Sequence, residues 1–329
     1  MRVIALEEHF TTELHHNNVV PEEPNPRYMR KEWQKGRGDQ LGFDITAELF
    51  DVGDHRIAGM DRAGIDVQVL SLTTPGCQPL EPELAKSVAR DANDRLFAAV
   101  QKYPERFKAF AALPTPDPRA ATEEFQRCIK QLGCVGAIIN GHTRAEYLDD
   151  KKYWPIFEMA QSLDVPIYLH PGAPPPAVMQ TYYKGFEELA RPAWGFAVET
   201  GTHFLRILFS GVFDNFPRLK IILGHLGEGL PFGLDRLCDH TVVMARNRKL
   251  KRPVKEYFRD NLVVTTSGNF SIPALLCTVQ VLGIDNVLFS VDFPYQDNMS
   301  GRTFLDTLPL SDSDIEKITH KNAERVLRL

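Results

Sequence analysis

The fold class that this sequence predicts is α/β, in the form of a (β/α)8 TIM barrel. Three observations predict it. Short apolar runs rich in β-branched residues recur along the 329 residues, and helical patterns alternate with them. The runs are apolar on both faces, as in a buried parallel sheet. They number eight, at residues 3–6, 67–72, 107–113, 135–139, 166–169, 219–223, 262–266 and 287–290.

No break in composition divides the chain, so we expect one barrel domain over residues 1–329. An open, doubly wound sheet is the alternative fold. The Gly-rich phosphate turn that usually follows the first strand of such a sheet is absent, which counts against it. Helical patterns fill the intervals at residues 83–102, 119–132, 153–163 and 273–282.

Two connections are long. Residues 11–50 form a polar loop insertion after the first strand, and residues 171–192 follow the fifth strand. Loops of this length are usually lids, binding loops or interface arms, although a tolerated surface insertion is an equal alternative.

Composition and charge exclude several classes of partner. The net charge of -5 gives no reason to expect nucleic acid or an anionic membrane. The five cysteines have irregular spacings without a CxxC pair, which favours free thiols in a reducing compartment. No apolar stretch has the length of a signal peptide or a membrane span, so we expect a cytoplasmic protein.

Ionisable residues gather where four of the predicted strands end. Glu7 and His9 are two apart on the first strand and therefore share a face, while His170, His225 and Asp292 close the fifth, sixth and eighth strands. Each residue alone has a simpler interpretation, such as a hydrogen-bonded structural histidine or a turn-capping aspartate. In a barrel, however, all strand carboxyl ends open onto one face. Their convergence favours a mixed nitrogen and oxygen site for Zn, Mn or Fe.

One metal ion is the simpler expectation. No lysine ends the fourth strand, at the position where barrel hydrolases with two metals often carry a carbamylated one. Of the other histidines, His142 follows that strand and can reach the pocket. His203 falls in a helical pattern, which favours a structural role.

Together these segments resemble the amidohydrolase superfamily over almost the whole chain. More narrowly, the chain is similar to the aminocarboxymuconate-semialdehyde decarboxylase-like branch, alongside the γ-resorcylate, 2,3-dihydroxybenzoate and 5-carboxyvanillate decarboxylases. The first histidine of the common His-x-His opening is replaced by Glu7, as in the hydroxybenzoate decarboxylases. The motifs that carry the resemblance are Ala5-Leu6-Glu7-Glu8-His9-Phe10, Tyr168-Leu169-His170-Pro171, Leu223-Gly224-His225-Leu226-Gly227-Glu228-Gly229-Leu230-Pro231, Thr266-Ser267-Gly268-Asn269 and Phe289-Ser290-Val291-Asp292-Phe293-Pro294.

The resemblance implies a role for each matching residue. His225 would be an acid/base residue that Glu228 orients, Asp292 would also move the proton to the ring, and Arg236 would lie near the substrate carboxylate. It also implies one Zn²⁺ or Mn²⁺ per chain, no organic cofactor, and a homodimer or homotetramer. The metal ligands that it implies are Glu7, His9, His170 and Asp292. From the sequence itself, Trp194, Phe293 and Tyr295 are candidates to stack on an aromatic substrate, with ordinary core packing as the alternative for each.

The activity implied is non-oxidative decarboxylation of an ortho-hydroxybenzoate-type acid in aromatic compound catabolism. An ortho hydroxyl allows the ring to accept a proton before CO2 leaves, with the metal as Lewis acid and template. The main alternative is a hydrolase of an amide, lactone or C–C bond on the same scaffold, in which the metal activates water; a hydratase is a variant. A non-catalytic barrel that serves as an interaction subunit is a third possibility.

Overall fold

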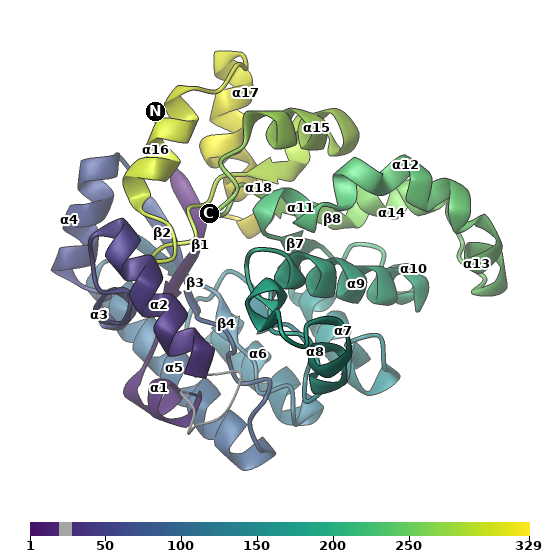
Figure 1. The fold of residues 1–329 in the computed structure, drawn as a ribbon, viewed down its shortest axis with the longest axis horizontal. Helices are drawn as coiled ribbons and strands as arrows, with labels where there is room; N and C mark the ends of the chain where they lie inside the picture. Colours follow the sequence, from purple (N-terminus) through teal and green to yellow (C-terminus); the bar gives the residue numbers. More distant parts are fainter. Residues whose placement is uncertain (20–27) are drawn as a thin grey trace.

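The computed structural model describes residues 1–19 and 28–329. It arranges parallel strands in a ring, with helices outside them (Figure 1). The strands follow one another as β1-β2-β3 and β4-β5-β6-β7-β8-β9. Only Phe110 separates β3 from β4, so the two fill the third of eight strand positions, and the predicted α/β barrel architecture is confirmed. The bounds are β1 (Ile4–Phe10), β2 (Val67–Leu72), β3 (Phe107–Ala109), β4 (Ala111–Ala112), β5 (Ala137–Asn140), β6 (Ile167–His170), β7 (Ile221–Leu223), β8 (Leu262–Thr265) and β9 (Val287–Leu288).

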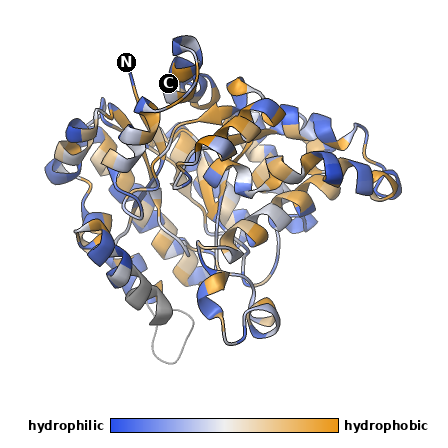
Figure 2. Ribbon diagram, turned by 45° about the horizontal axis from the view of Figure 1, so that its top comes forward, coloured by the Kyte–Doolittle hydropathy of each residue, from blue (hydrophilic) through white to orange (hydrophobic). Residues whose placement is uncertain are grey.

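The helices cover the outer face of this ring, with their polar sides outward and their apolar sides against the strands (Figure 2). None of the helices in the described ranges is long and apolar enough to cross a membrane. Their bounds are α1 (Glu13–Val19), α2 (Tyr28–Leu41), α3 (Ile45–Phe50), α4 (Asp54–Ala63), α5 (Pro82–Lys102), α6 (Pro118–Lys130), α7 (Trp154–Leu163), α8 (Pro176–Tyr182), α9 (Gly195–Phe209), α10 (Val212–Asn215), α11 (His225–Glu228), α12 (Leu230–His240), α13 (Val242–Asn247), α14 (Val254–Asn261), α15 (Ile272–Leu282), α16 (Asn298–Asp306), α17 (Asp312–Glu316) and α18 (Asn322–Leu327).

Local sequence explains how these helices begin and which face they bury. In α6, the Asp117 carboxylate caps the first turn by accepting from the amide of Ala120, and Pro118 occupies the first position. The buried side chains of this helix include Phe125 and Cys128, three residues apart on one face. Caps of the same kind start α15 at Ser271 and α16 at Asp297.

The two long connections are not loops throughout. Residues 11–50 contain α1, α2 and α3, and residues 171–192 contain α8, while residues 20–27 of the first connection lie outside the described part. A local signal marks the start of α3, because the Asp44 carboxylate accepts from the amides of Thr46 and Ala47 as a helix N-cap. The prediction of a polar loop after the first strand was therefore wrong in detail.

The barrel interior is filled by one apolar layer to which almost every strand contributes. It includes Ile4 and Leu6 of β1, Phe110 and Tyr168, and the C-terminal helix α18 adds Leu327. In β1 the pairing with β2 slips by one residue between Ala5 and Glu8, which marks a β-bulge. Strict alternation from Ile4 and Leu6 would turn Glu7 away from the interior. The bulge lets Glu7 and His9 also face inward, above the apolar layer.

The junction between the first and last strands is built differently from the rest of the ring. Within the described residues no strand ladder pairs β9 with β1. Instead, the amide of Glu7 donates to Ser290 Oγ at 2.6 Å and the amide of His9 donates to the carbonyl of Phe293 at 2.7 Å. We call this junction, residues 7–9 facing residues 290–293, the seam.

Candidate metal centre

Four side chains that are distant in sequence meet at the carboxyl end of the strands. Glu7 and His9 come from β1, His170 is the last residue of β6, and Asp292 lies in the turn after β9. One ligand atom from each lies within 4.8 Å of the other three. His170 Nε2 is 3.0 Å from Glu7 Oε1, and His9 Nε2 is 3.2 Å from Asp292 Oδ1. The structure therefore brings together the four residues predicted as ligands.

Two of the candidate ligand atoms lack a protein partner among the described residues, as expected for atoms that bind a cation. Glu7 Oε1 and His9 Nε2 are buried and have no hydrogen-bond partner within the described part of the chain. The 3.2 Å contact between His9 and Asp292 lacks hydrogen-bond geometry. Burial of an unpartnered carboxylate oxygen and an imidazole nitrogen is costly, whereas a divalent ion satisfies both.

The remaining polar atoms of the ligands are held by neighbours. His170 Nδ1 donates to the carbonyl of Pro171 at 2.8 Å, which leaves the lone pair of Nε2 directed at the cluster. His9 Nδ1 contacts Ser71 Oγ at 3.2 Å, and if Nδ1 donates there the lone pair of His9 Nε2 also faces the cluster. Such contacts fix the ring orientation and the tautomer of a ligating histidine.

Tyr168 holds the second oxygen of Glu7. Its hydroxyl donates to Glu7 Oε2 and also contacts Thr265 Oγ1 at 2.8 Å. Burial and the charge of Glu7 raise the pKa of the Tyr168 hydroxyl well above its ordinary value, so it remains a donor. The sequence analysis missed this residue. The signal was present, because Tyr168 precedes His170 by two positions and therefore shares its face of β6.

Replacing Tyr168 with phenylalanine is expected to weaken metal binding by about 10–100-fold, the usual effect of removing a partner of a metal ligand. The ring still fills its place in the barrel, so the fold is retained. Titration of stripped protein with Mn²⁺ or Zn²⁺ measures the change. Tyr257→Phe is the matched control, because its hydroxyl donates at 2.5 Å to Asp214, which is not a member of the metal cluster. Equal metal affinity in both variants would refute the role of Tyr168.

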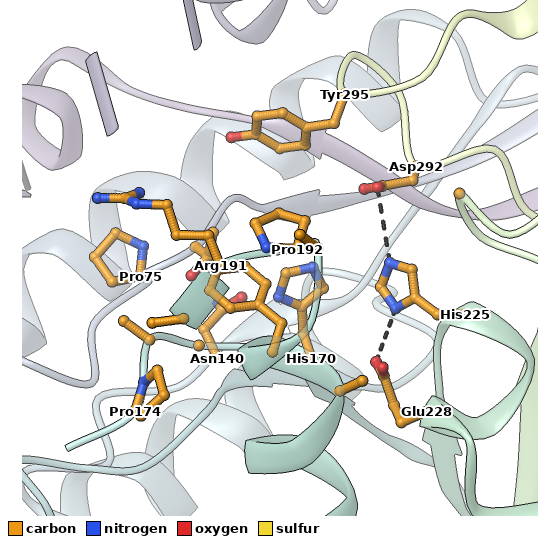
Figure 3. Close-up of a pocket in the computed structure, with 18 of the residues that line it drawn as sticks. Pro75, Asn140, His170, Pro174, Arg191, Pro192, His225, Glu228, Asp292 and Tyr295 are labelled. Carbon is orange, nitrogen blue, oxygen red and sulfur yellow. Dashed lines mark hydrogen bonds and ion pairs between the residues drawn. The ribbon is translucent and has the colours of Figure 1, made fainter. Parts of the chain in front are cut away.

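His225 and Glu228 form a pair that faces the cluster. His225 Nδ1 lies 2.8 Å from Glu228 Oε1, and His225 Nε2 lies 3.8 Å from Asp292 Oδ2 (Figure 3). Burial alone would lower the pKa of His225, but the negative charges of Glu228 and Glu7 outweigh it and raise that pKa well above the ordinary value. Glu228 thus fixes the imidazole with Nε2 directed at the ligand cluster.

This pair sits on an unusual turn. The segment α11 is not a regular helix, because its residues from His225 to Glu228 all have positive φ, between 51° and 84°. Non-glycine residues in this region cost about 1–3 kcal/mol each and persist where surrounding contacts hold them. Two such contacts are present: Asn269 donates to the carbonyl of His225, and Thr278 donates to the carbonyl of Leu226, both at 3.3 Å. Gly268 leaves room beside the pair, since a Cβ there would lie 3.1 Å from Asp292 Oδ2.

The cluster lies in the wall of a cavity of about 1070 Å³. His170, His225, Glu228 and Asp292 line one part of it, and Arg191 and Asn140 line another (Figure 3). Sites for small molecules commonly enclose about 300–1,000 Å³, so an aromatic acid fits easily. His142, which the sequence left as a possible pocket residue, also lines the cavity, whereas His203 is buried and accepts from the amide of Leu148.

The four residues predicted to contact substrate occupy different places. Tyr295 lines the cavity, and its hydroxyl contacts Thr73 Oγ1 at 2.7 Å. Phe293 is absent from the cavity lining; its ring packs against the guanidinium of Arg56 at 4.9 Å. Trp194 is 62% exposed, Arg236 is exposed on α12, and neither side chain lines the cavity of this chain.

Comparison with known proteins gives consistent matches. The family model described as "Amidohydrolase" matches residues 43–329. A γ-resorcylate decarboxylase from Polaromonas sp. is 38% identical, with 99% of this chain and 98% of that protein covered. A solved 2,6-dihydroxybenzoate decarboxylase complexed with 2,6-dihydroxybenzoate has a TM-score of 0.88 at 37% identity, with both chains covered completely. A 5-carboxyvanillate decarboxylase from Novosphingobium aromaticivorans, complexed with manganese, has a TM-score of 0.89 at 35% identity, covering 100% of this chain and 96% of that one.

Proposed function

The chain belongs to the amidohydrolase family, and on that premise we propose that it is a metal-dependent, non-oxidative decarboxylase of a hydroxylated aromatic carboxylic acid. The observation that carries this proposal is the set of four converging ligands beside the His225–Glu228 pair at one cavity. The 38% identity to γ-resorcylate decarboxylases over the full length supports the reaction class.

The reaction replaces a carboxylate by a proton on the ring. The ring carbon that bears the carboxylate accepts a proton, the C–C bond then breaks, and its electron pair returns to the ring as CO2 leaves. A bound divalent ion supplies Lewis-acid polarisation and a template for the carboxylate and its neighbouring hydroxyl. His225, held by Glu228 through Nδ1, presents Nε2 to the substrate hydroxyl, and the positive charge of an ion on the neighbouring cluster would favour the neutral imidazole that accepts the hydroxyl proton. Because the phenolate supplies the electrons, this chemistry requires no organic cofactor.

We propose one ion per chain, either Mn²⁺ or Zn²⁺, on Glu7, His9, His170 and Asp292. A set of two imidazoles and two carboxylates suits both metals. Manganese is the first to test, because relatives of both decarboxylase types have been solved with manganese bound. We treat residues 1–329 as one catalytic domain, since both ends of the chain supply ligands.

The expected partners are a small aromatic acid and further copies of the chain. We propose a homodimer or homotetramer, supported by large apolar side chains that remain exposed on the segments from α8 to α13; contiguous exposed apolar surface usually marks an interface. All five cysteines are free, which supports a reducing, cytoplasmic location. The exposed apolar side chains include Tyr182, Phe186, Leu189, Trp194, Val198, Phe232, Val242 and Val243.

The test is a panel of hydroxybenzoates with detection of released CO2. A 2-hydroxybenzoate-type acid, such as 2,6-dihydroxybenzoate, is expected to react, whereas 4-hydroxybenzoate is not, because only the ortho isomers offer a carboxylate and a hydroxyl side by side. Metal-stripped protein is the control. Equal turnover of both isomers contradicts the proposed binding mode. Turnover of neither, with hydrolysis of an ester or lactone instead, favours a hydrolase.

A further inference from the structure

Glu8, the neighbour of two metal ligands, is fully buried, and the reaction outlined above gives it no part. We propose that Glu8 is a positioning residue whose carboxylate fixes the turn that carries Asp292. The consequence for turnover rests on the proposed decarboxylation, whereas the consequence for metal binding does not.

Glu8 forms hydrogen bonds with residues on both sides of Asp292 in the sequence. Glu8 Oε1 accepts from the amide of Val291 at 2.9 Å and from the hydroxyl of Ser290 at 3.0 Å. Glu8 Oε2 accepts from the amide of Phe293 at 3.3 Å. One carboxylate thus holds the amides on both sides of Asp292.

Asp292 needs such a support for two reasons. Its φ is 76°, in the left-handed region that a non-glycine residue adopts only when its surroundings hold it there. It also lies beyond the end of β9, at the seam, where the described residues form no strand ladder with β1. No strand ladder in the described part of the chain therefore places this residue. Besides the backbone bond from the amide of His9 to the carbonyl of Phe293, the side chain of Glu8 holds the turn from β1.

A second buried side chain, that of Arg56, supports the same turn from the other side. The Arg56 guanidinium donates to the carbonyl of His9 at 2.6 Å and lies over the ring of Phe293. Gln68 links Glu8 to Arg56, since its Nε2 donates to Glu8 Oε2 at 3.4 Å and its Oε1 accepts from Arg56 at 3.5 Å. Together, Glu8 and Arg56 thus contact the segment that carries His9 and the turn that carries Asp292.

Glu8→Gln is the sharpest test, because it keeps the shape and changes one acceptor into a donor. The NH2 group of the new side chain then faces the backbone N–H of either Val291 or Phe293. Both groups are donors, so one hydrogen bond is lost in either orientation. We expect metal affinity and kcat each to fall by about 10–100-fold, the range for supports of metal ligands. KM should change less, since Glu8 does not line the cavity. Mn²⁺ titration followed by electron paramagnetic resonance reports the site without substrate.

Glu124→Gln is the matched control, because it makes the same chemical change at a partly buried carboxylate on α6 that pairs with Arg127. It should leave metal affinity and kcat unchanged. If Glu8→Gln does not fold, Glu8→Asp keeps the charge but draws the carboxylate away from the amides of Val291 and Phe293, and it should weaken metal binding by about tenfold.

The proposal is overturned if metal affinity and the resonance spectrum are unchanged in the folded Glu8 variant. It is also overturned if Glu124→Gln loses metal affinity to the same extent, because the effect is then general destabilisation. Absence of decarboxylation in the wild-type protein would instead contradict the proposed function, and the metal titrations would still test Glu8.

Discussion

Replacing His225 with asparagine should lower kcat by about 10²–10⁴-fold, the range for loss of a general acid–base group, while the metal stays bound. His225 Nε2 lies 3.8 Å from Asp292 Oδ2 and 4.0 Å from Glu7 Oε1, so it faces the ligands without being one of the four. Asparagine cannot accept the hydroxyl proton of the substrate at this place. Steady-state kinetics with metal analysis of the same sample measures both quantities.

His320→Asn is the control for this substitution, because His320 lies near the C-terminus and is absent from the cavity lining. It should keep the wild-type rate. A metal-replete His225→Asn that retains more than about a tenth of wild-type kcat excludes His225 as the base.

Replacing Asp292 with asparagine should abolish nearly all turnover in protein that still holds appreciable metal. The amide oxygen can coordinate a cation, but the side chain cannot carry a proton to the ring. Asp292 has the most exposed side chain of the four candidate ligands, and it lines the cavity, as His170 does, so its carboxylate can reach a bound substrate. Because the proton comes ultimately from solvent, decarboxylation in D2O should place one deuterium on the vacated ring carbon.

Asp297→Asn provides the comparison for Asp292. Asp297 lies five residues further along and caps α16 by accepting from the amide of Ser300. Because asparagine caps a helix about as well as aspartate, this variant should keep both its stability and its activity. If metal-replete Asp292→Asn keeps more than about a tenth of the wild-type rate, Asp292 is only a ligand and the proton donor lies elsewhere, with His225 the first candidate.

The convergence of the candidate ligands could be predicted once the strands were assigned to a barrel. Parallel strands of a barrel share one carboxyl end, so a strand-end position is enough to bring Glu7, His170 and Asp292 together. The amidohydrolase family and the decarboxylase class, which the resemblance implied, are confirmed. The third strand was predicted as one run over residues 107–113, whereas the structure divides it around Phe110.

Features that depend on backbone irregularities or on tertiary contacts escaped prediction. The bulge in β1 is not visible as a pattern, yet it lets Glu7 face inward after Leu6. Phe293 and Tyr295 lie in a turn, where the alternation of side chains along a strand does not apply. The sequence therefore could not show that Tyr295 lines the cavity while Phe293 packs on Arg56. No sequence pattern distinguishes Glu8 from an exposed glutamate, and its contacts at the seam explain its burial.

Trp194 and Arg236 are exposed in the single chain, and their predicted contacts with substrate stay predictions. Both residues belong to the segments on which apolar side chains remain uncovered, where Phe232 is 90% exposed. The sequence of one chain cannot state which of its surface residues an assembled oligomer would cover.

The most direct test of the account is a titration of metal-stripped protein with Mn²⁺ while CO2 release from 2,6-dihydroxybenzoate is followed. The account predicts no activity in the stripped protein and a linear recovery that saturates at about one ion per chain, as expected for a single mixed imidazole–carboxylate site. Saturation at two ions per chain, or full activity in stripped protein, would contradict the single site formed by Glu7, His9, His170 and Asp292.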